Sequence, residues 1–236
     1  MPLDISSRLE ALEASTASLL RSLESLGDDD VRAPSLLPEW SRGHVLTHVA
    51  RNADAMVNLV TWARTGTETP MYVSRDKRDA DITSGAVRSA AALRADVRES
   101  HEQLLQAMAE LSDEQWATSI RWGASGTAGA ARAIPTLRRT EVEIHHVDLD
   151  LAYTLAHLPE DFVEHLLTEV TADFSGRDDV PGMVLVGNED EGRWTVEPGG
   201  AELTGPPPSL LGYLLGRTDG MGLHTDGTLP RLAAWK

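Results

Sequence analysis

The sequence predicts an α+β protein, a four-helix bundle followed by a small α/β domain. Two observations predict the bundle: four long segments carry apolar residues at intervals of three and four, and polar or glycine-containing stretches separate them. A third observation predicts the second domain, because the later part of the chain consists of short strand-like and helical segments. We therefore expect a bundle over residues 1–158 and an α/β domain over residues 159–236.

The first two helices are predicted by their apolar stripes. The first is expected to end at GDDD, and its stripe consists of Ile5, Leu9, Leu12, Leu19, Leu23 and Leu26. The second begins after Ser41, a residue type that favours the N-cap, and runs to about Ala63. The polar stretch 66–84 contains one proline and is expected to be a loop.

The other bundle helices are predicted in the same way. The third covers about residues 85–111, and 122–133 (WGASGTAGAARA) reads as a flexible connection. The fourth begins at Pro135, because proline is favoured in the first helical turn, and runs to about His157.

The second domain is expected to begin with a helix. That helix covers about residues 161–174, and a proline-started helix follows at 207–217. The strand-like segments are MVLVG, RWTVEP, AELTG and a last one within GLHTDGTLP.

The composition excludes several classes of protein. The net charge of -16 with no basic patch argues against nucleic-acid binding. The sequence contains no run of 18 apolar residues, so it predicts no membrane-spanning helix. The first residues do not resemble a signal peptide, and we therefore expect a cytoplasmic protein. The chain has no cysteine, so any thiol chemistry must use a thiol supplied from outside.

The candidate site begins in RRTEVEIHHVDLDLAY, residues 138–153. Glu141 and His145 are four residues apart, so they share one helix face. The aliphatic members of this face argue against an ordinary exposed Glu–His pair; the face consists of Leu137, Glu141, Ile144, His145, Asp148, Leu151 and Leu155. Glu143 and His146 are expected to point away from this face, into solvent.

His48 of the second helix shares an apolar face with Val45 and Val49. Such a histidine is usually a packed core residue, but a bundle could place it opposite Glu141 and His145. Three such ligands with a fourth position open are typical of catalytic zinc. His44, one turn earlier, is an alternative ligand.

Two further residues have plainer readings. His101 lies on the core stripe of the third helix and is expected to be packed there. Arg217 could simply be a cation that favours a helix C-terminus. The sequence contains neither a phosphate-binding GK[ST] loop nor a G-x-S-x-G nucleophile motif.

Several motifs together resemble the mycothiol-dependent maleylpyruvate isomerases, members of the DinB-like metal-binding superfamily. They are EWSRGHVLTHVARNA, WARTGTETPMYVS, RRTEVEIHHVDL, a late LLGR and the DGTLP tail. The resemblance implies a DinB-like metal-binding bundle with a small α/β domain. By position it also implies zinc ligands at His48, Glu141 and His145 and a catalytic arginine at Arg217. His146 departs from the small residue that relatives often carry there.

The resemblance implies cis–trans isomerisation of maleylpyruvate to fumarylpyruvate in the gentisate pathway. A thiolate adds to the double bond, the bond rotates, and the thiol is eliminated; zinc activates the thiol, and mycothiol supplies it. Arg217 would bind the dicarboxylate substrate or its enolate, and Asp148 would orient a ligand. Tyr72 and Arg75 are candidate substrate or thiol contacts.

Two other functions remain open at this point. A mycothiol S-transferase of the same fold would act on another electrophile, although the ETPMYVS segment favours the isomerase. A non-catalytic protein would use the metal only to brace the bundle, and its fold would then depend on that metal.

Overall fold

The computed structural model describes residues 4–123, 126–188 and 191–235, and the chain forms two compact units. The units are Met1–Ala152 and Tyr153–Lys236. The expected boundary after residue 158 lies a few residues later. The first unit is a helical bundle and the second combines helices with a small sheet, so the predicted α+β class is confirmed.

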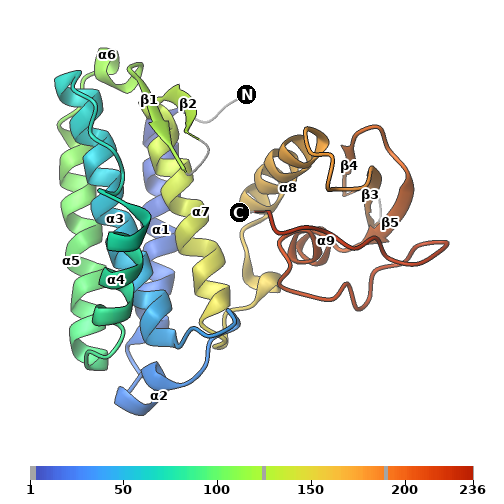
Figure 1. The fold of residues 1–236 in the computed structure, drawn as a ribbon, viewed down its shortest axis with the longest axis horizontal. Coiled ribbons are helices and arrows are strands. Elements are labelled where there is room, and N and C mark those ends of the chain that lie inside the picture. The colour runs from blue at the N-terminus through green and yellow to red at the C-terminus, as the bar shows by residue number, and fades with distance from the viewer. Residues whose placement is uncertain (1–3, 124–125, 189–190, 236) are drawn as a thin grey trace. The chain divides into compact units, whose positions relative to one another are not determined.

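Four long helices form the bundle: α1 (Ile5–Leu23), α3 (Arg42–Thr65), α5 (Ala90–Ala109) and α7 (Ile134–Asp148). They run side by side in Figure 1, and α3 packs against both α5 and α7 while α1 packs against α7. The core is aliphatic, as the predicted stripes require, and includes Leu12, Leu19, Val49, Leu59, Leu93, Val97, Leu104 and Val142. None of the helices in the described ranges combines the length and apolar character that crossing a membrane requires.

Side-chain caps set the starts of α1, α3 and α5. Asp4 accepts a hydrogen bond from the Ser7 amide at 2.9 Å, and Ser41 accepts one from the His44 amide at 3.4 Å. Gly66 ends α3 in the left-handed conformation at φ 72°, which glycine adopts without a Cβ clash. The helix that positions His48 therefore begins and ends where its sequence predicts.

The expected loop at 66–84 is wrong in its second half, which forms α4 (Arg75–Gly85). Ser74 caps this helix by accepting a hydrogen bond from the Lys77 amide at 3.1 Å. Its one buried residue is Ile82, so the helix has no apolar stripe to reveal it. α5 consequently begins at Ala90 rather than near residue 85.

The connection expected at 122–133 is also wrong, because most of it is ordered as strand and 3₁₀ helix. β1 (Ser119–Trp122) pairs antiparallel with β2 (Thr127–Ala130), and η1 (Ala131–Ala133) leads into α7. Gly123 and Gly126 have φ values of 70° and 67°, which suit a tight turn. Residues 124–125 of that expectation lie outside the described ranges.

Two short helices occupy the remaining connections. The first long helix ends at Leu23, so Leu26 lies beyond it and GDDD does not form its end; the aspartates of GDDD instead begin α2 (Asp28–Arg32). Aspartates suit the first turn of a helix, where the backbone N–H groups are unpaired. α6 (Asp113–Trp116) precedes the β1–β2 hairpin.

α7 ends at Asp148, well before the expected His157. Asp150 adopts a left-handed φ of 52°, which stops the helix. Arg42 stabilises this end by donating from Nε to the Leu149 carbonyl at 2.6 Å and from Nη2 to the Asp150 carbonyl at 2.8 Å. Leu151 and Leu155 therefore do not extend the α7 face that carries Glu141.

The second unit packs two helices with a three-stranded sheet. After η2 (Leu155–His157) come α8 (Glu160–Ser175), β3 (Met183–Gly187), β4 (Arg193–Val196), β5 (Ala201–Gly205) and α9 (Pro207–Leu214). β3 lies centrally, antiparallel to β4 and parallel to β5. The strand expected within GLHTDGTLP is reduced to one isolated bridge between Thr204 and His224.

Candidate metal centre

His48, Glu141 and His145 face one another between α3 and α7. One nitrogen or oxygen from each of the three side chains lies within 4.8 Å of the other two. Oε2 of Glu141 lies 3.0 Å from Nε2 of His48 and 3.3 Å from Nε2 of His145. The two imidazole rings meet edge to face, with their centroids 4.5 Å apart. Residues 93 positions apart in the chain thus form one cluster.

The spacing of these atoms fits a tetrahedral metal ion. Zinc with nitrogen and oxygen ligands at about 2.0–2.1 Å keeps neighbouring ligand atoms roughly 3.3 Å apart. The two Nε2–Oε2 distances, 3.0 and 3.3 Å, match that separation. Two imidazoles and one carboxylate are suitable donors for zinc and for other divalent ions. The cluster can therefore hold one ion and leave a coordination position open.

Asp148 orients His145 from the next turn of α7. Its Oδ2 lies 2.8 Å from Nδ1 of His145, and Asp148 is fully buried. The carboxylate accepts the Nδ1 proton, which leaves Nε2 of a neutral imidazole with its lone pair facing the cluster. The expected proximity of Asp148 to a candidate ligand is therefore present in the structure.

Arg78 of α4 approaches His48 from the other side. Its Nη2 lies 3.3 Å from Nδ1 of His48, and its guanidinium lies 5.7 Å from the centre of the Tyr72 ring. A guanidinium only donates, so Nδ1 of His48 accepts this bond and Nε2 carries the proton that Glu141 accepts. Metal coordination through Nε2 requires the other neutral tautomer, with the proton on Nδ1, and Arg78 could then no longer donate to that nitrogen.

Electrostatics among the residues of the cluster favour a charged Glu141–His145 pair. Burial opposes ionisation of Glu141, but the hydrogen bonds from His145 and His48 hold its pKa well below the usual value. Burial also opposes charge on His145, yet Asp148 and Glu141 outweigh it and raise its pKa to about 9. Burial and the neighbouring His145 lower the pKa of His48. A divalent cation would replace the proton that the acidic groups now attract.

A fully buried arginine lies one turn before Glu141 on α7. Nη1 of Arg138 donates to the Val49 carbonyl at 2.7 Å and to Oδ1 of Asn52 at 2.8 Å. Burial lowers its pKa to about 10, while Glu141 acts in the opposite direction. Arg138 therefore supplies a second positive charge near the carboxylate from inside the bundle.

Of the other residues predicted to contact the substrate or thiol, Tyr72 lies near the cluster, whereas Arg75 and Arg217 have other surroundings. Tyr72 lies beside Arg78, and burial raises the pKa of its phenol, with Glu141 adding to the effect. Arg75 is exposed at the first position of α4 and forms no hydrogen bond or ion pair with the described residues. Arg217 belongs to the second unit, where it is half-buried and its Nη1 donates to the Leu215 carbonyl at 2.8 Å.

The alternative histidines lie elsewhere. His44 caps α3, since its Nδ1 lies 2.8 Å from Oγ and 3.2 Å from the backbone nitrogen of Ser41. The expectation that Glu143 and His146 are solvated is wrong, because both are buried against α1. Oγ of Ser15 donates to Glu143 at 2.5 Å, and Nε2 of His146 lies 2.8 Å from Oγ of Ser22. α1 covers this α7 face, so polar residues there need internal partners.

The residue patterns did not indicate Arg78 or Arg138. Arg78 lies in the polar stretch expected to be a loop, and Arg138 was not assigned to the helix face that carries Glu141. A signal existed for Arg138: it lies three residues before Glu141, so it follows the same i, i+3 spacing.

Two family models match almost the whole chain. The mycothiol maleylpyruvate isomerase N-terminal domain matches residues 12–150, and the corresponding C-terminal domain matches residues 157–234. A search of curated protein sequences found no match.

Solved structures give the same result. The chain is 31% identical to a mycothiol-dependent maleylpyruvate isomerase, with a TM-score of 0.92 and coverage of 99% of this chain and 98% of that one. A histidine-to-alanine variant of the mycothiol-dependent maleylpyruvate isomerase gives the same values. YfiT from Bacillus subtilis, described as a four-helix bundle of unusual topology, is 16% identical with a TM-score of 0.53, covering 64% of this chain and 89% of that one. That last likeness concerns the fold alone.

Proposed function

Because this chain belongs to the mycothiol-dependent maleylpyruvate isomerase family, we propose that it converts maleylpyruvate to fumarylpyruvate with mycothiol as the thiol. The observation that carries the proposal is the convergence of His48, Glu141 and His145 within 4.8 Å in a chain that matches the family over nearly its whole length. The reaction would serve gentisate breakdown.

These three residues would hold a zinc ion. When bound, zinc with an open coordination position would lower the pKa of a thiol that coordinates there, so that the thiol is deprotonated at neutral pH. The chain contains no cysteine, so the sulfur comes from mycothiol. Asp148 keeps the proton of His145 on Nδ1 and directs Nε2 toward the ion.

The chemistry requires a temporary single bond. The thiolate forms a bond to one alkene carbon, the double bond becomes single, and its electron pair moves to the conjugated carbonyl oxygen as an enolate. After rotation, the enolate reforms the double bond and the carbon–sulfur bond breaks, so the thiolate leaves unchanged. The protein's task is to hold the dianion in position and stabilise the enolate.

Arginines supply the positive charge that a dianion needs in a chain of net charge -16. We assign this task to Arg78 and Arg217. Arg78 is adjacent to His48, and its guanidinium becomes available for a carboxylate when metal coordination displaces it from Nδ1. Arg217, in the second unit, is the residue at the family's catalytic arginine position, and by that match alone it is proposed to bind a carboxylate or the enolate oxygen. Tyr72 contacts Arg78 and would limit its range of positions.

The test is an ultraviolet assay of maleylpyruvate conversion by zinc-loaded protein, with and without mycothiol. We expect thiol-dependent formation of fumarylpyruvate, loss of zinc and activity in His48→Ala, and retention of both in His44→Gln, whose side chain caps the same helix. No conversion by folded, zinc-loaded protein would overturn the proposal. Thiol transfer to another electrophile by the same preparation would then identify an S-transferase.

A further inference from the structure

A polar hollow lies in the first unit, between α3, α4 and the turn into α5. Its volume is about 420 Å³, within the range of small-ligand pockets. Thr47 and Arg51 line it from α3, Lys77, Asp81 and Ser84 from α4, and Arg88 from the turn. His48, Glu141 and His145 are not among its lining residues, so it is distinct from the candidate metal centre.

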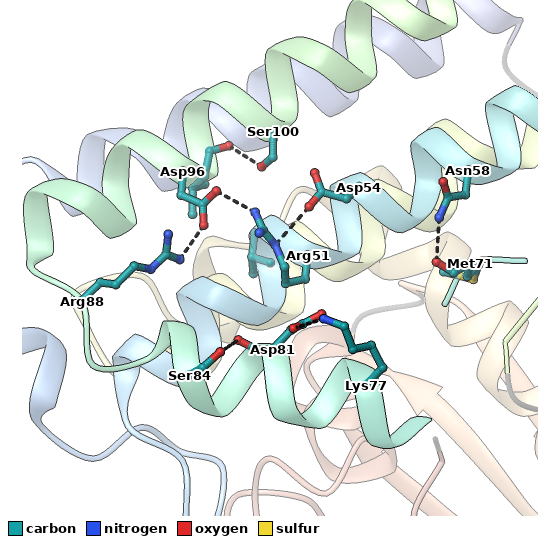
Figure 2. A network of polar contacts seen from close by, with 12 residues as sticks. Arg51, Asp54, Asn58, Met71, Lys77, Asp81, Ser84, Arg88, Asp96 and Ser100 are labelled. Carbon is teal, nitrogen blue, oxygen red and sulfur yellow. Dashed lines mark hydrogen bonds and ion pairs between the residues drawn. The ribbon is translucent and has the colours of Figure 1, made fainter. Parts of the chain in front are cut away.

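Two arginines at this hollow are held by one shared carboxylate. Nη2 of Arg51 lies 2.6 Å from Oδ1 of Asp96, and Nη2 of Arg88 lies 2.5 Å from Oδ2 of the same residue (Figure 2). Nε of Arg51 also lies 3.0 Å from Oδ2 of Asp54. Asp54 and Asp96 do not line the hollow, so they fix the guanidinium groups without filling it. Nη1 of each arginine forms no hydrogen bond within the described ranges and remains available as a donor.

Thr47 is the observation that points to a ligand. Thr47 is a lining residue of the hollow and is 1% exposed, yet its hydroxyl has no hydrogen-bond partner among the described residues. Other helical threonines of this chain donate to the carbonyl four residues earlier, as Thr16, Thr65 and Thr171 do. A buried hydroxyl without a partner is unfavourable, so a group in the hollow that accepts its hydrogen bond would be stabilising.

Gly85 leaves the space that this hydroxyl needs. A Cβ on Gly85 would lie 2.4 Å from Cγ2 and 3.0 Å from Oγ1 of Thr47. Any larger residue would therefore push Thr47 out of its position. The close approach of α4 to α3 depends on this glycine and sets one wall of the hollow.

The hydrogen-bond donors at the hollow identify the class of ligand. The lining carries three cations (Arg51, Lys77 and Arg88) and one carboxylate, Asp81, while Asp54 and Asp96 hold the arginines from outside the lining. Lys77 pairs with Asp81 in an exposed ion pair, which is weak and can be exchanged for another partner. We propose that this hollow binds a small polyvalent anion of the phosphate or carboxylate class. Arg51 and Arg88 donate to it from Nη1, Lys77 from Nζ, and Thr47 from its hydroxyl.

The test titrates the full-length, zinc-loaded protein with inorganic phosphate and, separately, with succinate, by calorimetry at constant ionic strength. One saturable site for at least one of the two anions is expected, and the stronger binder distinguishes the phosphate from the carboxylate source. Phosphate also binds zinc, so the titrations are repeated with His48→Ala, in which this binding must persist. No saturable binding, or binding that disappears in His48→Ala, would overturn the proposal.

Matched variants locate the site. Arg88→Gln and Thr47→Val should each weaken binding by at least tenfold, whereas Arg98→Gln, an exposed position on α5, should not change it. Thr47→Val is nearly isosteric and removes the unpartnered hydroxyl, so without anion it should keep or raise the melting temperature. Equal weakening in Arg98→Gln would show a non-specific charge effect and would overturn the proposal.

Discussion

Asp148 and His145 form a buried carboxylate–imidazole pair on α7, with Oδ2 and Nδ1 separated by 2.8 Å. The 3-residue spacing places the acceptor directly below the ring, and full burial of Asp148 shields the pair from water. Such a partner both selects the tautomer and increases the basicity of the other ring nitrogen. Asp148 is thus expected to set how strongly His145 binds a metal ion.

Asp148→Asn should weaken metal binding by about 10- to 100-fold, the effect typical of losing an outer hydrogen-bond partner of a ligand. Competition with a chromogenic chelator measures this affinity. Asp150→Asn is the matched control, because Asp150 is exposed and asparagine tolerates its left-handed φ of 52°. Equal affinities of Asp148→Asn and the parent protein would exclude this role for Asp148.

Removing the metal should abolish activity before it affects the fold. His48 and His145 each lie within hydrogen-bonding distance of Glu141, and the bundle core is independently apolar. Circular dichroism should retain the helical signal, while zinc at about a thousand times its Kd should add roughly 4 kcal/mol to the free energy of unfolding. Collapse of the helical signal on chelation would instead indicate a metal that braces the bundle.

Arg78→Gln should raise the KM for maleylpyruvate about 10- to 100-fold, since a charge-assisted hydrogen bond contributes roughly 1.5–3 kcal/mol. Zinc affinity should stay the same or increase, because a cation next to His48 is removed. Arg75→Gln on the same helix is the control, since Arg75 is exposed. A fall in zinc affinity with an unchanged KM would mean that Arg78 only orients His48.

His101 should make the protein less stable in acid. It is buried in α5, with Nδ1 3.5 Å from Oγ1 of Thr16, and burial, reinforced by Arg138, lowers its pKa to about 4. The unfolded chain takes up this proton below about pH 6.5 and the folded chain only near pH 4, so stability falls across that interval. The loss approaches roughly 3 kcal/mol below pH 4. Urea unfolding at several pH values should show a shallower decline for His101→Gln, and parallel curves would contradict the assignment.

The sequence predicts the parts of the fold that depend on apolar periodicity. The bundle helices and the β3, β4 and β5 strands follow from their patterns because each buries one face. α4 escaped prediction because Ile82 is its one buried residue, and the end of α7 did because Asp150 and Arg42 determine it through backbone geometry. The hydrogen bonds of Arg42 to the end of α7 join residues distant in the chain, so local sequence patterns do not reveal them.

The same distinction applies to the candidate site. The spacing of Glu141 and His145 predicted a shared face, and His48 and Asp148 were already candidates; the structure supplies the contacts of these two and adds Arg78. Glu143 and His146 show the limit of prediction from helix spacing. Their positions predicted that their side chains point away from the Glu141 face, but not that α1 packs against them and buries them. Burial of a polar residue depends on which element packs against it.

The polar character of α4 also has a consequence for its local dynamics. With Ile82 as its one buried residue, little free energy opposes its transient detachment, so its amide hydrogens should exchange with deuterium much faster than those of α3. Native-state exchange followed by mass spectrometry measures this difference, and equal protection of α3 and α4 would refute it. Each such opening would move Arg78 away from His48 and Lys77 away from the polar hollow at the same time. The candidate metal centre and the hollow would then both be exposed to incoming molecules while the bundle stays folded.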